Sequence, residues 1–244
     1  MSYVTAIVLA AGRGLRFKSK ITKPILKINS RPIIIYCLDI LSKHPNIRDI
    51  IVVVNSKNSR SIIRKIGQCR IKKIKDVVLG GRRRQDSVAK ALRAIDVRTA
   101  LVLIHDAVRP FIDKEMVSSV LKEAKKSGAA IVGVPVKATI KEVTKSRSHE
   151  VTSRVLVKKT LDRDSLWEVQ TPQVFKKELI MEAYNKFGNS EVTDDASLLE
   201  KIGVRVKIVR GSYFNIKITT PEDLVLAEAI AKYLAFSRQS SVIS

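Results

Sequence analysis

Short apolar runs typical of strands alternate with helix-like segments along most of this 244-residue chain. The runs at 3–9, 50–54 and 101–105 are almost wholly apolar, whereas the segment 32–43 repeats its apolar residues at helical spacing. This order is the signature of βαβ units, and continuous apolar strands are typical of sheets that are buried on both faces. We therefore predict an α/β fold with a mostly parallel sheet and helices on both faces.

The full set of expected elements keeps this rhythm. Strands are expected at 3–9, 50–54, 77–79, 101–105, 129–134, 204–209 and 214–218. Helices are expected at 32–43, 58–66, 86–95, 113–126, 177–187, 193–202 and from 220 onward. Asp113 and Gly128 have the residue types of an N-cap and a C′ position, and Pro221 with Asp223 resembles a capping box.

Residues 136–160 interrupt the alternation. Two stretches with strand character flank a polar turn at 146–150, which predicts an inserted β-arm that protrudes from the α/β body. A lone hairpin cannot form a core, so we expect its apolar positions to pack on a second subunit. No linker or repeat divides the rest, and we expect one domain over 1–244 with the arm as a subregion.

The composition limits the functional classes. The formal net charge of +23 predicts attraction to polyanions, and nucleic-acid binding is one alternative. However, the cations are spread along the chain, and aromatic residues make up only 5%, too few for an evident base-stacking platform. We therefore interpret the excess charge mainly as a means of steering phosphorylated substrates.

The same composition bears on location. The longest apolar runs are far shorter than the ~20 residues of a membrane span. Cys37 and Cys69 lack metal or redox spacing, and no signal-peptide pattern precedes the first strand. We expect a cytoplasmic protein with no membrane partner.

The loop after the first strand carries the strongest functional signal. The strand runs into Ala10-Ala11-Gly12-Arg13-Gly14-Leu15-Arg16, and Lys23 follows seven residues later. Small residues let backbone N–H groups approach a ligand, and the two cations indicate an anion such as a polyphosphate. A P-loop would need Lys-Ser or Lys-Thr after Gly14, and a dinucleotide fingerprint would need glycine at Phe17. An ordinary glycine turn with solvated cations is the alternative.

A carboxylate follows a buried strand at Asp106, within His105-Asp106-Ala107-Val108-Arg109-Pro110. Ligands of open α/β sheets bind at the carboxyl ends of the strands. A carboxylate there can hold Mg²⁺ against phosphates, because Mg²⁺ takes one or two carboxylates together with phosphate oxygens. The alternative is that Asp106 pairs with Arg109 or caps a turn.

The run from Gly80 to Ser87 joins a strand to a helix. Gly81 leaves room for a base or ribose, and Ser87 can hydrogen-bond a base edge. In the alternative interpretation, Asp86 is an N-cap and the arginines are solvated.

Three later segments are candidate contacts for a phosphorylated ligand. Residues 170–173 and 193–197 place hydroxyls at an expected turn or helix start, where they either bind phosphate or simply cap the helix. Lys217 lies in an otherwise apolar strand pattern, and the direction of its side chain decides its role.

Taken in order, these motifs resemble the 2-C-methyl-D-erythritol 4-phosphate cytidylyltransferase family of the non-mevalonate isoprenoid pathway. The resemblance covers nearly all of residues 3–235, and it is the order and spacing of the motifs that make it specific. The motifs are L-A-A-G-x-G-x-R, K-P, G-G-x-x-R-x-D-S, H-D-A-x-R-P, T-L-D-R, Q-T-P-Q, T-D-D-A-S and N-I-K-I-T-x-P-E-D.

The resemblance implies a Rossmann-like nucleotidyltransferase domain that forms a homodimer through the β-arm. It implies that CTP is bound by Ala10, Ala11, Gly12, Arg13, Gly14, Gly81, Arg82, Ser87 and Ala107. It implies a Mg²⁺ cofactor with Asp106 as metal ligand, and catalytic roles for Arg16, Lys23, Asp106, Arg163 and Lys217. It implies that the sugar-alcohol phosphate contacts Arg109, Thr139, Thr171 and Thr193, and that Thr139, Arg109 and Arg163 are contributed across the dimer.

Two positions depart from the family pattern. Pro24 stands where members often have glutamine, and Arg82 stands where many have an acidic residue, so that only its backbone is expected to serve the ribose.

Two further alternatives concern function. Ribitol-5-phosphate cytidylyltransferases share H-D-A-V-R-P-F and N-I-K-I-T-T-P, but they usually have a second glycine in place of Ala11 and differ before 170–173. A sugar-nucleotide-binding regulator would keep the fold without the activity, and the retained Arg16, Lys23, Asp106 and Lys217 argue against it.

Overall fold

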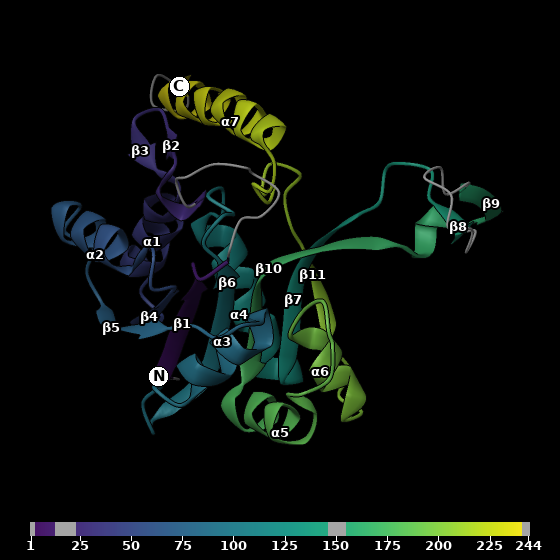
Figure 1. Cartoon of the computed structure of the whole chain (residues 1–244), viewed down its shortest axis with the longest axis horizontal. Coiled ribbons are helices and arrows are strands. Elements are labelled where there is room, and N and C mark those ends of the chain that lie inside the picture. Colours follow the sequence, from purple (N-terminus) through teal and green to yellow (C-terminus); the bar gives the residue numbers. More distant parts are fainter. Residues whose placement is uncertain (1–2, 13–22, 146–154, 241–244) are drawn as a thin grey trace.

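A computed structural model describes residues 3–12, 23–145 and 155–240 of the chain (Figure 1). Within them, a central seven-stranded sheet has the order β11-β7-β10-β6-β1-β4-β5. Its strands are β1 Tyr3–Leu9, β4 Ile47–Val54, β5 Ile74–Leu79, β6 Thr99–Asp106, β7 Ala129–Pro135, β10 Trp167–Lys176 and β11 Lys207–Arg210. β1 runs parallel to β4 and β6, β4 to β5, and β7 to β11, while β10 is antiparallel to both its neighbours. The predicted mostly parallel sheet is confirmed.

Helices cover both faces of this sheet, as expected. The helices are α1 Ile33–Lys43, α2 Ser59–Gln68, α3 Arg84–Leu92, α4 Lys114–Ser127, α5 Lys177–Phe187, α6 Ala196–Lys201 and α7 Pro221–Ser240. Successive strand residues point to opposite faces, so Ile50 and Val52 of β4 pack in one core with α1, α2 and α4, whereas Ile51 and Val53 pack in a second core with α3, α5 and α6. This double burial explains the continuous apolar runs in the sequence.

A third, smaller core holds α7 near the carboxyl edge of the sheet (Figure 1). Ala227 of α7 packs there with Ile28 of the small hairpin β2 Lys27–Ile28 and β3 Arg31–Pro32, and with Phe111 and Ile218. One of the two bonds of the predicted capping box is present, because the Asp223 carboxylate accepts a hydrogen bond from the backbone N–H of Thr220 and another from that of Thr219. α7 thereby fixes the chain that leads away from Lys217.

A two-stranded hairpin extends far from the α/β body within the segment where the arm was expected (Figure 1). Its strands, β8 Lys141–Lys145 and β9 Val155–Thr160, are antiparallel. Val155, Leu156 and Val157 of β9 are all more than half exposed. Packing of these side chains on a second subunit stays a prediction.

The predictions for two segments near the site are wrong. Residues 170–173 are not a turn or helix start but the middle of β10, where the register against β7 shifts between Gln170 and Gln173 to accommodate Pro172. Residues 214–218 do not form a strand, because no strand lies alongside them; Ile218 N–H instead donates to Val108 O.

Several helix boundaries also differ from expectation. α6 begins at Ala196 rather than Thr193, and α7 continues past Phe236. α3 begins at Arg84, so Arg83 is its N-cap. Asp86, which was expected as a possible N-cap, is instead the third residue of the helix, and its carboxylate accepts a hydrogen bond from Arg83 N–H. In contrast, Asp113 caps α4 through Met116 N–H, and Gly128 ends it at φ 89°, both as predicted.

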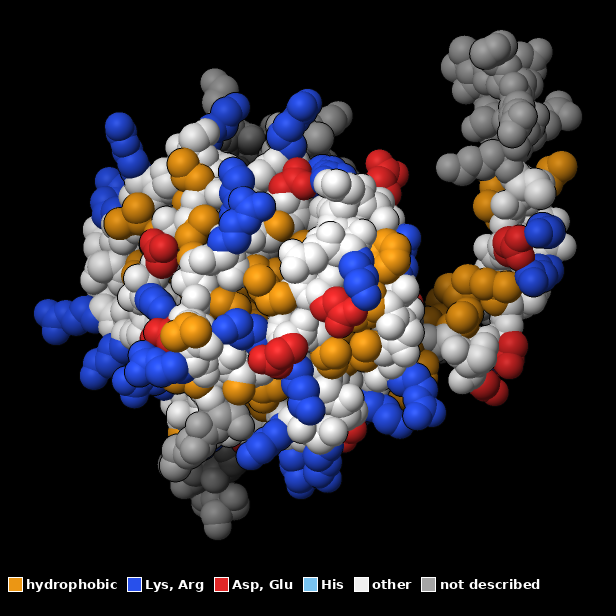
Figure 2. Space-filling view, turned by 90° about the horizontal axis from the view of Figure 1, so that it is seen from below, with side chains coloured by type: hydrophobic (Ala, Val, Ile, Leu, Met, Phe, Trp, Pro, Cys, Tyr) orange, Lys and Arg blue, Asp and Glu red, His pale blue; other side chains and the backbone are white. Residues whose placement is uncertain are grey.

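The basic side chains are dispersed over the face that Figure 2 shows. Figure 2 shows lysine and arginine over most of the visible face of the body, interspersed with acidic and apolar side chains. Such a distribution favours general attraction of anions over one dedicated binding patch. Among the described helices, none is both long enough and apolar enough to cross a membrane.

Candidate active site

The carboxyl ends of β1, β4 and β6 meet at one edge of the sheet, and the expected ligand loops leave from there (Figure 1). Ala107 N–H, just after β6, donates to Leu9 O at the end of β1 (3.0 Å), and Ala10 N–H donates to Val53 O of β4 (2.7 Å). These bonds bring Ala10 and Ala107, expected from distant parts of the sequence to bind the nucleotide, to the same edge.

Two asparagines fix the start of the glycine loop. Asn58 Nδ2 donates to Ala10 O (2.8 Å) and Asn55 Nδ2 donates to Ala11 O (3.1 Å). The two asparagines also bind each other, since each backbone N–H donates to the other's side-chain oxygen. Sequence reasoning missed this pair, although asparagines just after a strand are a turn signal.

Gly80 and Gly81 let α3 begin directly against the Ala10–Gly12 segment. A Cβ at Gly80 would lie 2.6 Å from Ala11 Cβ and 2.7 Å from Ser87 Oγ, so a larger residue would push the two loops apart. Gly81 N–H donates to Ser87 Oγ (3.0 Å), which ties the loop to the helix. The structure therefore brings Gly81 and Ser87 to the loop after β1, while Arg82 is exposed.

Asp106 is the charged centre of this edge. Lys217 Nζ lies 2.7 Å from Asp106 Oδ2, and Arg84 Nε lies 3.7 Å from Asp106 Oδ1. Burial would raise the pKa of Asp106, but Lys217 and Arg84 outweigh it and hold the pKa at about 2. Asp106 is thus an ionised carboxylate near neutral pH, and it pairs with these two cations rather than with Arg109 as in the alternative interpretation.

Arg84 continues the charged network away from Lys217. Its NH2 group lies 2.8 Å from Asp195 Oδ2, and Tyr184 OH donates to Asp195 Oδ1 (2.6 Å). Burial acts to lower the pKa of Arg84, yet Asp195 and Asp106 raise it above its ordinary value. Sequence reasoning missed Arg84 and Asp195, although both lie inside motifs that had been singled out.

A buried chain of hydrogen bonds through His105 and Thr171 holds the backbone of Asp106 in place. His105 Nε2 lies 3.0 Å from Arg109 O, which can only accept, so Nε2 carries the proton and Nδ1 accepts from Thr171 Oγ1 (3.0 Å). Thr171 Oγ1 in turn accepts from Asp106 N–H (3.1 Å). Burial lowers the pKa of His105 to about 4, which agrees with a neutral ring. The Thr171 hydroxyl therefore positions Asp106, and its expected substrate contact stays a prediction.

The segment that carries Lys217 is clamped by Asn215 and Arg109. Asn215 Nδ2 donates to Thr171 O (2.9 Å), and Arg109 NH1 donates to Asn215 O (2.7 Å). Ile216 and Ile218 both pack in the third core. Lys217, which lies between them in sequence, points to the opposite side, toward Asp106. Arg109 is itself buried. The clamp explains how a lysine outside any sheet is held in place.

Lys23, in the short 3-10 helix Lys23–Ile25, reaches the same segment. Its ammonium donates to Thr219 O, two residues beyond Lys217. The structure thus brings together Lys23, Lys217 and Asp106 among the expected catalytic residues. Arg13, Gly14 and Arg16 lie outside the described residues.

Of the other expected residues, Thr139 lies in the arm and Arg163 lies just after it. Arg163 is exposed and donates to Lys137 O (3.3 Å), and Thr139 is exposed on the strand-free stretch before β8. Figure 1 shows this part of the chain well away from the sheet edge. Their participation therefore depends on a second subunit, which stays a prediction.

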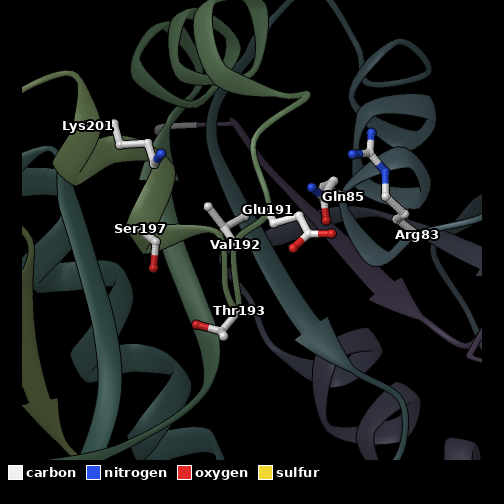
Figure 3. Close-up of a pocket in the computed structure, with 7 residues that line it drawn as sticks. All are labelled: Arg83, Gln85, Glu191, Val192, Thr193, Ser197 and Lys201. Atoms are coloured by element: carbon white, nitrogen blue, oxygen red, sulfur yellow. The ribbon is translucent and has the colours of Figure 1, made fainter. Parts of the chain in front are cut away.

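Thr193 borders a separate surface cavity of about 620 Å³. Figure 3 shows it between the start of α3, which carries Arg83 and Gln85, and α6, which carries Ser197 and Lys201. The cavity adjoins the Asp194–Asp195 turn, since Ser197 N–H and Oγ both donate to Asp194 Oδ1. Thr193 thus lines this cavity and lies two residues before Asp195 of the Arg84 network.

The described side chains around Asp106 can bind a divalent cation only together with a phosphate. Among the described residues, no group of three or more His, Cys, Asp or Glu side chains could hold a metal. Asp106 supplies one carboxylate, and Mg²⁺ accepts such a site when substrate phosphates provide further oxygens. A metal here would therefore depend on a bound phosphate.

Comparison with known proteins shows which family this chain belongs to. The model of the family IspD, 2-C-methyl-D-erythritol 4-phosphate cytidylyltransferase, matches residues 4–233. This chain belongs to that family. A cytidylyltransferase of this name from Syntrophus aciditrophicus (strain SB) is 43% identical over 234 residues, covering 94% of this chain and 96% of the relative. Its namesake from Alkaliphilus metalliredigens (strain QYMF) is 41% identical over 94% and 93% of the two chains.

Solved structures of the cytidylyltransferase family share the fold. The 4-diphosphocytidyl-2C-methyl-D-erythritol synthase of Anaerococcus prevotii DSM 20548 superposes with a TM-score of 0.81 at 33% identity, covering 95% of this chain and 96% of the other. The Francisella tularensis 2-C-methyl-D-erythritol 4-phosphate cytidylyltransferase superposes with a TM-score of 0.75 at 31% identity, covering 94% of this chain and 100% of the other. The Rossmann-like body expected from the resemblance is confirmed.

Proposed function

We propose that this protein transfers the cytidylyl group of CTP to 2-C-methyl-D-erythritol 4-phosphate in non-mevalonate isoprenoid precursor synthesis. A phosphate oxygen of the acceptor attacks the α-phosphorus of CTP and forms a new P–O bond. The bond from the α-phosphorus to the bridging oxygen breaks, and pyrophosphate leaves with that electron pair. The products are 4-diphosphocytidyl-2-C-methyl-D-erythritol and pyrophosphate.

The observation that carries the proposal is the Asp106–Lys217 pair at the edge where the Ala10–Gly12 and Gly80–Ser87 loops meet, in a chain of this family. Both reactants are anions, so their repulsion is a large part of the barrier, and fixed cations can offset it. The acceptor phosphate is ionised at neutral pH and needs no general base. The neutral, fully engaged His105 agrees with chemistry that uses none.

Each expected residue has a role in this reaction. Lys23 and Arg16 stabilise the triphosphate and the leaving pyrophosphate, and Lys217 and Arg163 hold the acceptor on the line of attack. Ala10–Gly14 with Gly81, the Arg82 backbone, Ser87 and Ala107 enclose the nucleotide, and Arg109, Thr139, Thr171 and Thr193 serve the acceptor. Asp106 would hold Mg²⁺, which supplies Lewis-acid neutralisation of phosphate charge.

The active form in this proposal is a cytoplasmic homodimer built through β8 and β9. The exposed apolar side chains of β9 support it, as does the exposed Arg163 just after the arm, which donates to Lys137 O rather than to any residue around Asp106. One nucleotidyltransferase domain with its arm is the functional unit. Nucleic acid has no part in it, since the cations are spread along the chain and, on the face shown in Figure 2, over the surface.

Pyrophosphate release tests the proposal. The purified protein is supplied with each nucleoside triphosphate in turn, with methylerythritol 4-phosphate or ribitol 5-phosphate as acceptor and with or without Mg²⁺. We expect release with CTP and methylerythritol phosphate that depends on the metal. Release with ribitol 5-phosphate instead would show that ribitol 5-phosphate is the acceptor. No release with either acceptor would contradict the proposed activity.

A further inference from the structure

Arg84 bridges two buried carboxylates that belong to different parts of the site. It is the first residue of α3 and directly follows the Gly80–Arg83 loop. Its guanidinium lies 3.7 Å from Asp106 at the end of β6 and 2.8 Å from Asp195 in the turn before α6. One side chain thus connects the loop expected to enclose the nucleotide, the charged centre and the turn that carries Thr193.

The charges around Arg84 alternate along a continuous path. Lys217, Asp106, Arg84 and Asp195 carry positive, negative, positive and negative charge in that order. The Asp195 side chain is 1% exposed and that of Asp106 is 10% exposed. Without the Arg84 charge, Asp106 would keep its ion pair with Lys217, whereas Asp195 would lose the one ion pair it makes among the described residues. An unpaired buried charge is strongly unfavourable.

The anchor of Arg84 on Asp195 is itself rigid. Asp195 N–H donates to Gln173 Oε1 (3.2 Å), and Gln173 Nε2 donates to Asp194 Oδ2 (2.8 Å), so β10 holds the turn. Tyr184 OH fixes the second Asp195 oxygen. The shorter contact of Arg84 is with Asp195, so Asp195 holds the guanidinium while its Nε lies beside Asp106 Oδ1, the oxygen that Lys217 does not contact.

The neighbouring arginines of the same loop do not share this position. Arg83 pairs locally with Asp86, with NH2 2.7 Å from Asp86 Oδ1, and Arg82 is exposed. The special character of Arg84 therefore comes from its place at the start of α3 and not from the basic run as such.

We propose that Arg84 is a positioning residue: anchored on Asp195, it orients the Asp106 carboxylate and couples the nucleotide loop to the reacting phosphates. The inference rests on the proposed function. Arg84 touches neither reactant; it acts through Asp106, and its removal should affect turnover and metal binding more than the binding of CTP. Loss of such an indirect partner typically costs about 10–100-fold in metal affinity or activity.

The test compares four variants of the full-length protein. Arg84→Met removes the charge at similar length, Arg84→Lys keeps the charge but cannot bridge both carboxylates, and Asp195→Asn removes the anchor while leaving Arg84. Arg93→Met, which changes the exposed C-cap residue of the same helix, is the matched control. Steady-state kinetics, melting temperature, CTP binding by calorimetry and Mn²⁺ binding to the CTP complex by electron paramagnetic resonance are measured for each.

We expect Arg84→Met and Asp195→Asn each to lower kcat about 10–100-fold and to weaken Mn²⁺ binding to the CTP complex by a similar factor. The KM for CTP should change only by about threefold or less, since uniform binding is kept. Compared with Arg84→Met, the Arg84→Lys variant should have a higher melting temperature but a similarly low kcat. Arg93→Met should match the wild type in every measurement.

A lower melting temperature with unchanged kcat and unchanged Mn²⁺ binding in both Arg84→Met and Asp195→Asn would show a purely structural role and overturn the proposal. Should Arg84→Met not fold, the isosteric Asp195→Asn decides, because it keeps an acceptor for Tyr184. Should the wild type release no pyrophosphate, the proposed function fails, yet the Mn²⁺–CTP measurement still tests the coupling.

Discussion

Lys217 Nζ lies 2.7 Å from Asp106 Oδ2, and this ion pair joins a segment that no strand holds to the end of β6. The Lys217 side chain is 40% exposed, so its ammonium can reach solvent while it pairs with a nearly buried carboxylate. An anion that enters this edge meets a cation that the clamp of Asn215 and Arg109 has already placed. Preorganised charge of this kind needs little rearrangement at the moment of reaction.

Lys217→Met should therefore remove a placed cation without removing the fold. Asp106 keeps Arg84 as a partner, and Ile218 keeps its place in the third core. We expect kcat to fall by about 10²-fold or more, the scale of one lost transition-state donor. Pyrophosphate release measures it, with the exposed Lys232→Met on α7 as the control. A Lys217→Met protein with near-normal kcat would refute the role.

His105 should make stability depend on pH between about 6.5 and 4. Burial lowers the pKa of His105 from 6.5 to about 4, so the folded state prefers the neutral ring. The stabilisation from the neutral ring is complete above the unfolded pKa and is lost as pH falls through the folded pKa. Across this window the loss amounts to about 3 kcal/mol in the free energy of unfolding.

His105→Gln isolates that contribution from other titrating groups. Denaturant unfolding of both proteins at several pH values gives the difference in their free energies of unfolding. We expect the advantage of the wild type to shrink steadily from pH 6.5 to pH 4. A difference that stays constant over this range would mean that the buried ring is not held neutral.

Gly81→Ala should displace the start of α3. A Cβ at Gly81 would collide with Asp86, whose backbone carbonyl carbon would lie 3.1 Å away, so the backbone itself must move. We expect a loss of about 1–3 kcal/mol in the free energy of unfolding, as for overpacking, and weaker CTP binding by calorimetry. Gly67→Ala is the control: it has open space in α2, and it should be neutral or slightly stabilising. Equal behaviour of the two variants would contradict the steric argument.

Arg163 should act on the partner's site. Arg163→Ala and Lys23→Ala are each expected to lower kcat by about 10²-fold. A dimer with one chain of each variant has one site with both residues intact, so mixing the two inactive proteins should restore pyrophosphate release. Absence of recovery, with mixed dimers demonstrated by tagged chains, would show that each site is built from one chain.

The exposed side chains of β9 should hold the dimer. Leu156 is 63% exposed on the arm, and Leu156→Glu would place a charge where we expect an apolar contact. Light scattering on the eluting protein should then report a monomer, whereas Val97→Glu, at a site of the body that is even more exposed, should leave the dimer intact. A dimeric Leu156→Glu protein would assign dimerisation to another surface.

The fold class could be predicted because strand and helix periodicity is local. The run 3–9 coincides with β1 and 177–187 with α5, and Asp113 and Gly128 mark the ends of α4, since caps and apolar spacing act within a few residues. The predictions failed where pairing with a distant partner decides. Residues 170–173, which include Pro172, were expected as a turn or helix start but lie within β10. Residues 214–218 have an apolar pattern but are not part of a strand.

For the site, the sequence by itself determined which residue types are available: small residues after β1, a carboxylate at the end of β6, and Lys23 and Lys217 as cations. Only the tertiary structure decided their relations, namely that Lys217 points at Asp106 and that Arg84 connects Asp106 to Asp195. The physical reason is that an ion pair depends on distance in space. The packing of Ile218 and the clamp by Asn215 set that distance, and both depend on segments remote in the chain.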